Sequence, residues 1–198
     1  VVTGFGRLGT MFGCDVYGMK PDIITIAKGL TSAYAPLSGS VISGRMYDVI
    51  AAGTDTHGVF GHGWTYSAHP IGAAAGIANL NLIDSLELVE NAARVGAYLT
   101  SELQRGLAGH PAVAEVRGVG MLAAVELAPP GRDLEAFDPA ASVVPRLVAE
   151  IARGGIIARP MPQSDIIGFA PPLCLTKDEA DHIVQVTQEA IEAFDFGG

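Results

Sequence analysis

The chain has 198 residues, 49% of them hydrophobic and 17% charged, which argues against disorder and allows one large core or two small ones. Its formal net charge of -9 argues against a nucleic-acid partner, because clustered Lys and Arg hold phosphate backbones. The two cysteines, Cys14 and Cys174, form no C-x-x-C pair, so we expect no disulfide framework, no structural zinc site and a reducing, cytoplasmic location.

The N-terminal part is predicted to form strands joined by turns. Val1 and Val2 are typical of a strand end that runs into a glycine-rich turn. Residues 21–29, PDIITIAKG, place a β-branched run between a proline and a glycine, and this pattern predicts a buried strand. Residues 37–43, LSGSVIS, predict another strand.

A long helical region is predicted over residues 70–106. It has a proline near its first turn, then small residues at helical spacing, and then an apolar stripe. Its longest weakly polar run, residues 71–83, is too short to span a bilayer and contains two asparagines. We therefore expect no membrane partner.

The C-terminal part is predicted to alternate strands with helices. Thr176 is expected to cap the final helix, which continues to about Phe194, with Glu179 completing a capping box. The other elements expected here are one or two strands over 113–128, a helix over 143–154, and short strands over 155–160 and 165–175. The whole pattern indicates an α/β chain with a smaller α+β unit from about residue 107.

Residues 4–9, GFGRLG, spell the G-x-G-x-x-G of a dinucleotide-binding fingerprint. That fingerprint requires an amphipathic helix that begins at its last glycine, whereas Gly13, Gly18 and Pro21 interrupt the following stretch. Asp22 lies about 20 residues on, but it begins a strand, and the ribose-binding acid belongs at a strand's end. The pattern favours a glycine-rich turn, with a nicotinamide enzyme as a much weaker alternative.

Several motifs in one order resemble the class III, pyridoxal-phosphate-dependent aminotransferases of fold type I. These motifs are TGFGRLGTMF, YGMKPDIITIAKGL, YAPLSGSVIS, HGWTYSAHPIGAAAG and IARPMPQSDIIGFAPPLCLT. The resemblance covers essentially the whole chain. It implies the C-terminal half of the large domain with its mixed or parallel sheet, over 1–106, and the α+β C-terminal small domain, over 107–198.

Lys28 is the candidate catalytic residue. A lysine at the end of a buried strand would be partly desolvated, which favours the neutral, nucleophilic amine. Considered alone, Lys28 fits a snorkelling surface lysine better than a catalytic one. In its AKG context, the resemblance implies that Lys28 holds pyridoxal 5'-phosphate as a Schiff base and, once released, moves a proton between substrate and cofactor.

Three further residues are implied to bind the cofactor. Thr65 lies in the glycine-rich GHGWTYS, where backbone N–H groups and a hydroxyl suit a phosphate. The resemblance implies that Thr65 binds the phosphate from a neighbouring subunit, that Trp64 lines the same place and that Val1 lies against the pyridine ring. Without the resemblance, a strand or turn threonine with a buried tryptophan is a plausible alternative.

Besides Trp64, Arg159 is the candidate substrate-binding residue. It lies at a strand end before a proline, where an arginine can pair bidentately with a carboxylate. The resemblance implies that it binds the substrate carboxylate and swings aside for amines that lack one. A surface arginine is the alternative.

The function implied is a ping-pong transfer of an amino group from an amine or ω-amino acid to a keto acid, with pyruvate as the expected acceptor. The motifs resemble the ω-amino acid:pyruvate and amine:pyruvate branch more than the ornithine or GABA branches, and aminomutases and decarboxylases stay open. We expect a homodimer with its active site at the interface. A non-catalytic module that keeps the fold is a further alternative.

Two negative expectations complete the picture. His57, His62 and His69 have no common zinc spacing, so we expect no metal site. The resemblance also implies an aspartate that pairs with the pyridine nitrogen, and other cofactor-binding elements, upstream of Val1. We therefore expect this chain alone to be inactive and poorly soluble.

Overall fold

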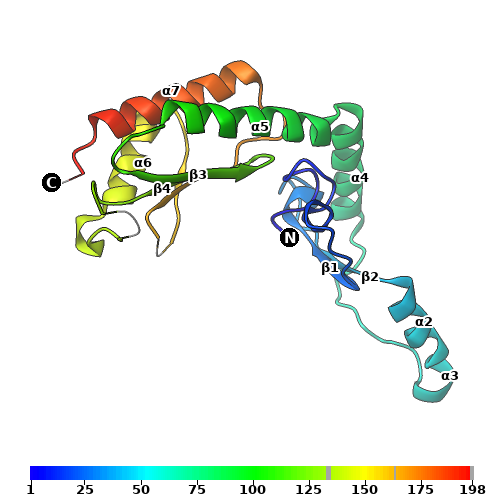
Figure 1. The fold of residues 1–198 in the computed structure, drawn as a ribbon. Helices are drawn as coiled ribbons and strands as arrows, with labels where there is room; N and C mark the ends of the chain where they lie inside the picture. The colour runs from blue at the N-terminus through cyan, green and yellow to red at the C-terminus, as the bar shows by residue number, and fades with distance from the viewer. Residues whose placement is uncertain (133–134, 163, 197–198) are drawn as a thin grey trace. The chain divides into compact units, whose positions relative to one another are not determined.

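The computed structural model describes residues 1–132, 135–162 and 164–196 as a mixed α/β chain (Figure 1). Packing divides the chain into two compact units, residues 1–89 and 90–198, which are described separately. Sequence analysis places a domain boundary after residue 106 instead. The packing boundary falls earlier because helix α5 (Leu88–Gly106) contributes Leu99 and Leu103 to the core of the second unit.

The first unit begins with a loop that is closed by a bridge between Gly4 and Phe12. Strands β1 (Ile23–Ile26) and β2 (Gly39–Ile42) pair antiparallel as a two-stranded sheet. The short helix α1 (Gly13–Val16) precedes β1, and the 3-10 turn η1 (Lys28–Leu30) lies between the two strands. The prediction of a buried strand is wrong for β1, since Ile23 is 51% exposed. In the described sheet β2 is its only neighbour, so little covers it.

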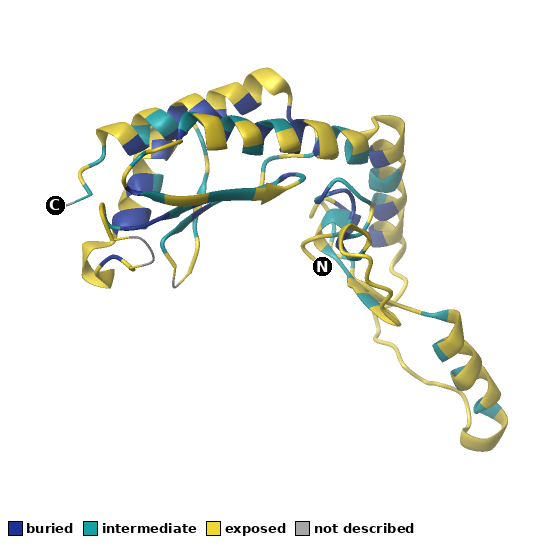
Figure 2. Cartoon of the chain, in the orientation of Figure 1, coloured by how far each residue is buried: buried dark blue, intermediate teal, exposed yellow. Residues whose placement is uncertain are grey.

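Three helices complete the first unit: α2 (Gly44–Ala52), α3 (Thr54–His57) and α4 (Pro70–Ser85). The first two helices are not predicted from the sequence, although Ser43 caps α2 by accepting a hydrogen bond from the Met46 N–H. Figure 2 shows α2 and α3 almost wholly exposed. The core of this unit is small and lies where α4 packs near the glycine-rich loop; its buried members are Phe5, Leu30 and Ile83.

The second unit packs helices against a four-stranded antiparallel sheet of order β3-β4-β6-β5. Its strands are β3 (Val113–Val119), β4 (Leu122–Leu127), β5 (Arg159–Pro160) and β6 (Ile166–Phe169). Its further helices are η2 (Pro139–Ala141), α6 (Val143–Arg153) and α7 (Lys177–Ala193). These bounds confirm the predicted helices and the strands over 113–128, whereas the strands predicted over 155–160 and 165–175 are shorter and cover only 159–160 and 166–169.

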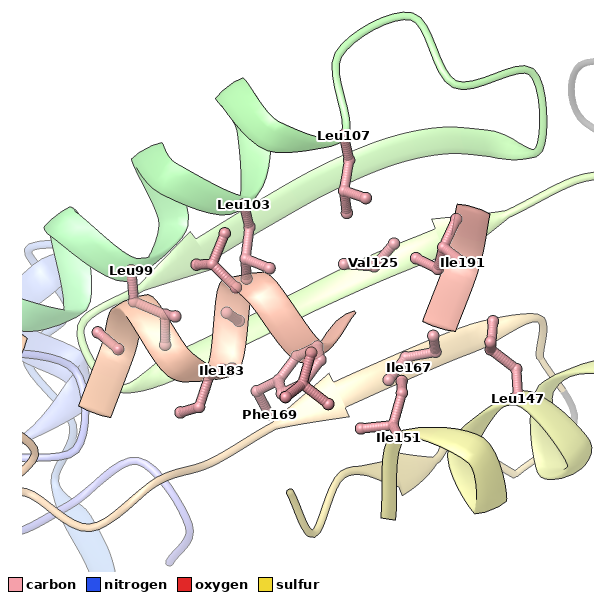
Figure 3. Packing of buried hydrophobic residues seen from close by; sticks show 14 of the residues in the cluster. Leu99, Leu103, Leu107, Val125, Leu147, Ile151, Ile167, Phe169, Ile183 and Ile191 are labelled. Carbon is pink, nitrogen blue, oxygen red and sulfur yellow. The ribbon is translucent and has the colours of Figure 1, made fainter. Parts of the chain in front are cut away.

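The core of the second unit forms between the sheet and helices α5, α6 and α7. Figure 3 shows side chains from these helices pointing toward those of β4 and β6. Alternate residues of the central strands are buried, and of these Val125 and Ile167 are fully buried. The capping box predicted for α7 is confirmed: the Glu179 N–H donates to Thr176 Oγ1, and the Thr176 N–H donates to the Glu179 carboxylate.

Candidate functional site

Lys28 lies in the turn that leaves strand β1, and its side chain is exposed. Sequence analysis predicts a partly desolvated lysine, whereas this lysine is open to solvent. The cause is that β1, the strand before it, pairs only with β2 in the described sheet. Its backbone has a φ of 48°, in the left-handed region that non-glycine residues rarely adopt. Among the described residues no carboxylate forms an ion pair with Lys28, so its amine is available for chemistry.

The loop of residues 4–12 packs against the turn that contains Lys28. Phe5, itself with a φ of 56°, is buried and contacts the Phe12 ring edge-on at 5.6 Å between centroids. A Cβ added at Gly29 would lie 3.1 Å from the Phe5 Cβ. Gly29 therefore allows the turn to approach the loop closely.

The dinucleotide interpretation is not supported by the structure. The loop closes on itself through Gly6 and Gly9, both with positive φ, and the helix that follows it has only four residues. Asp22 accepts hydrogen bonds from Ser43 and Arg45, so it ties the start of β1 to the start of α2. GFGRLG thus serves as a turn that supports the lysine-bearing segment.

Val1 lies at the edge of a pocket of about 200 Å³ between the glycine-rich loop and β1. Ile24, Thr25 and Ile26 form its strand side, while Phe12 and Gly13 belong to its loop side. Lys28 is not among its lining residues, although it follows Ile26 by two positions. Val1 and the strand that leads to Lys28 are therefore neighbours.

Thr65 and Trp64 lie in an exposed, irregular segment, residues 58–69, between α3 and α4. Trp64 is 76% exposed, its ring meets that of His62 edge-on at 4.9 Å between centroids, and its backbone N–H donates to Ser67 Oγ. Within the described chain, the backbone N–H groups of residues 59–63 have no hydrogen-bond partner. The segment therefore presents free donors and a threonine hydroxyl, a set of groups that suits a phosphate.

Arg159 lies in β5, one of the two edge strands of the described four-stranded sheet, opposite Gly168 of β6. Its side chain is exposed, and in the residues that the structure describes it has no carboxylate partner. An unpaired guanidinium on a strand edge is suited to receive a carboxylate from solution. Arg159 belongs to the second unit and Lys28 to the first.

The predicted residues fit pyridoxal phosphate by their chemistry, with an available primary amine on Lys28 and free anion donors near Thr65. No described contact joins Thr65 or Trp64 to Lys28. Over 1–132, 135–162 and 164–196, no three metal-ligating side chains gather at one place. No described helix is both long enough and apolar enough to cross a membrane.

Comparison with known proteins identifies an aminotransferase family and several transaminases as relatives of this chain. The Aminotransferase class-III family matches residues 1–191. A diaminobutyrate–2-oxoglutarate transaminase of Halomonas elongata is 52% identical over 96% of this chain and 41% of its own length. A probable gamma-aminobutyrate transaminase 4 of Oryza sativa subsp. japonica is 36% identical over 98% of this chain and 40% of its own length. The chain thus spans about two fifths of these relatives.

Solved structures show the same similarity. A transaminase from directed evolution by ancestral reconstruction has a TM-score of 0.94 at 54% identity, over 97% of this chain and 42% of that one. An (S)-enantioselective ω-transaminase from Thermomicrobium roseum has a TM-score of 0.88 at 42% identity, over 97% and 42% respectively. The predicted fold class is therefore confirmed.

Proposed function

Since the chain belongs to the class III aminotransferases, we propose that it moves an amino group from an amine or ω-amino acid to a keto acid, with pyridoxal phosphate held on Lys28. The main support is the placement of Lys28, an unpaired and exposed amine on a turn that two other segments hold. This activity is proposed for the protein in which these residues meet the rest of the site.

Each residue has a distinct role in this proposal. Pyridoxal phosphate, when bound, supplies an electron sink for the substrate carbon. Lys28 would hold the cofactor covalently, and its amine, once freed, would move a proton from the substrate carbon to the cofactor. Thr65 and the N–H groups around it bind phosphate oxygens, while Val1 and Trp64 limit the space around the ring and exclude water.

Arg159 is proposed to bind the carboxylate of the keto acid. A guanidinium pairs with a carboxylate through two parallel hydrogen bonds, which fixes the keto acid's orientation. An arginine that is free to move aside also lets the same pocket take amines without a carboxylate.

Pyruvate is our proposed acceptor, and 2-oxoglutarate is the second candidate. The Halomonas relative is named for 2-oxoglutarate, and at 52% identity it favours that alternative. The two acceptors differ in size and in the number of carboxylates. Each has at least one carboxylate, so Arg159 would pair with either. Ornithine-type, GABA-type and aminomutase activities remain alternatives within the family.

A homodimer is proposed because the segment that contains Thr65 is exposed in this chain. Large apolar side chains gather on it and its flanks: Val59, Phe60, Trp64, Tyr66 and Ile71. Such a surface suits burial against a second copy, whose cofactor Thr65 would reach. Cys14 and Cys174 are free thiols, which suits the reducing cytoplasm that we propose.

The lysine assignment is tested by trapping pyridoxal phosphate. The chain has three lysines, Lys20, Lys28 and Lys177, so two internal controls are present. The protein in which these residues meet the rest of the site is incubated with pyridoxal phosphate and reduced with borohydride, and peptide mass spectrometry should find that, of these three lysines, Lys28 carries most of the phosphopyridoxyl group. Equal labelling of all three lysines would contradict the assignment, and Lys28→Arg should remove the main product.

The role of Arg159 is tested with paired substrates. Arg159→Leu should raise the KM for the keto acid by about tenfold or more, since a charge-assisted pair is lost. The KM for an amine donor without a carboxylate should stay unchanged. A parallel rise in both values would mean that Arg159 supports the fold instead of the substrate.

A further inference from the structure

Asn79 of helix α4 forms hydrogen bonds with the segment that directly follows Lys28. Its Nδ2 donates to the carbonyl of Gly29 at 2.8 Å and to that of Leu30 at 3.2 Å. Its Oδ1 accepts a hydrogen bond from Ser32 Oγ at 2.7 Å. The amide orientation follows from these partners, because two carbonyls can only accept and therefore face the NH₂ side.

The segment that Asn79 binds contains residues with unfavourable backbone conformations. Lys28, Ser32 and Ala33 have φ values of 48°, 48° and 63°, three non-glycine residues in the left-handed region within six positions. Such conformations persist only where surrounding contacts determine them. Within the segment, the N–H groups of Thr31 and Ala33 both donate to the Lys28 carbonyl, so the turn is closed around Lys28 itself.

Hydrogen bonding to this segment from outside comes from a single side chain among the described residues. In the described parts of the chain, Asn79 is the one side chain beyond residues 27–35 that hydrogen-bonds to them. Helix α4 comes close enough because Gly76, one turn earlier, is buried: a Cβ there would lie 3.1 Å from Leu37 Cδ2 and 3.9 Å from the Leu30 carbonyl oxygen. The close packing of helix α4 thus brings Asn79 within hydrogen-bonding distance of the turn.

We propose that Asn79 is a positioning residue for Lys28, which fixes the turn that aims the lysine amine. The proposal rests on the proposed function of Lys28, but the contact itself is independent of any cofactor. Asn79 touches no reacting atom and acts through the backbone of residues 29–30. An asparagine suits the task because a single planar amide can donate to two adjacent carbonyls and accept from a hydroxyl.

Asn79→Asp is the most informative variant, with Asn81→Asp as its matched control. Aspartate keeps the shape of the side chain but places acceptors against the carbonyls of Gly29 and Leu30. Asn81 lies on the same helix, is exposed, and makes no hydrogen bond to the turn, so it receives the same charge change without the contact.

The first measurement is amide hydrogen exchange without cofactor. In Asn79→Asp, the amides of Leu30, Thr31 and Ala33 should exchange about tenfold faster, the range for two lost hydrogen bonds of ordinary strength. The α4 amides and all amides of Asn81→Asp should exchange as in the parent protein. Acceleration spread over α4 and the whole first unit would instead mean that Asn79 only stabilises the helix, and would overturn the proposal.

The second measurement is pyridoxal phosphate trapping, read as the ratio of label on Lys28 to label on the exposed Lys20. This ratio should fall several-fold in Asn79→Asp and stay unchanged in Asn81→Asp. An unchanged ratio in Asn79→Asp would refute the positioning role. If the parent protein itself shows no preference for Lys28, the proposed function fails, while the exchange data still decide whether Asn79 holds the turn.

Ser32→Ala is a milder variant for use if Asn79→Asp does not fold. It removes the hydroxyl that orients the Asn79 amide at the protein surface and leaves α4 intact. It should produce smaller changes of the same kind, confined to residues 29–33 and to the Lys28 label. No change in either measurement would overturn the proposal.

Discussion

Gly96 of helix α5 allows the helix to rest directly on the hairpin between β3 and β4. A Cβ added there would lie 2.0 Å from the Gly120 carbonyl oxygen, 2.2 Å from its carbon and 2.9 Å from its Cα. Ordinary carbon–oxygen contacts are about 3.3 Å or longer, so Gly96→Ala would push the hairpin away by roughly 1 Å. Because the clash is with backbone at a tight turn, no rotamer change relieves it.

The magnitude follows from two opposing effects. Overpacking of this kind costs about 1–3 kcal/mol, and a clash with backbone belongs at the upper end. Alanine in place of glycine inside a helix stabilises by about 1 kcal/mol. We therefore expect a net loss of about 2 kcal/mol in the second unit. The sheet continues from β4 through β6 to β5, so the strain also reaches the strand that contains Arg159.

Hydrogen exchange of the β4 amides measures this loss, because it reports the free energy of opening of this unit. Tryptophan fluorescence would not report this loss, because the one tryptophan, Trp64, lies in the first unit. Ala97→Gly, at the exposed neighbouring position, is the control and should lose about 1 kcal/mol through helix propensity alone. If Gly96→Ala proves as stable as the parent protein, the close packing of α5 on the hairpin is refuted.

Three other outcomes are expected. Thr176→Ala should lower the free energy of unfolding by about 1 kcal/mol in urea titrations, because the cap of α7 is lost; no loss would argue against the cap. Hydrogen bonds from the Thr176 N–H and hydroxyl lower the pKa of Glu179, so its stabilising contribution is present above the unfolded pKa, near 4.3, and lost as pH falls through the folded value. Glu179→Gln should therefore show a weaker acid dependence of stability. Gly29→Ala should reduce trapping of pyridoxal phosphate on Lys28, because its Cβ meets Phe5 at 3.1 Å; unchanged labelling would contradict the role of the loop.

Local signals were sufficient to predict most of the second unit. The helix α7 has a capping box at its start, and α6 has an apolar face and a glycine pair at its end, so residues close in sequence specify both. The motifs around Lys28 and Thr65 were likewise enough to suggest the family, which the comparisons then confirmed. Helices α2 and α3 were missed because they are exposed and lack a sustained apolar stripe.

Contacts between distant residues were decided only by the tertiary structure. Burial of β1 depends on which strands flank it, and a run of β-branched residues does not specify its neighbouring strands. The hydrogen bonds of Asn79 to the turn join residues about fifty positions apart, and the approach of Phe5 to Gly29 depends on the folded loop. Residue types thus specify the chemistry of Lys28, whereas packing of α4 and the glycine-rich loop decides how that lysine is held.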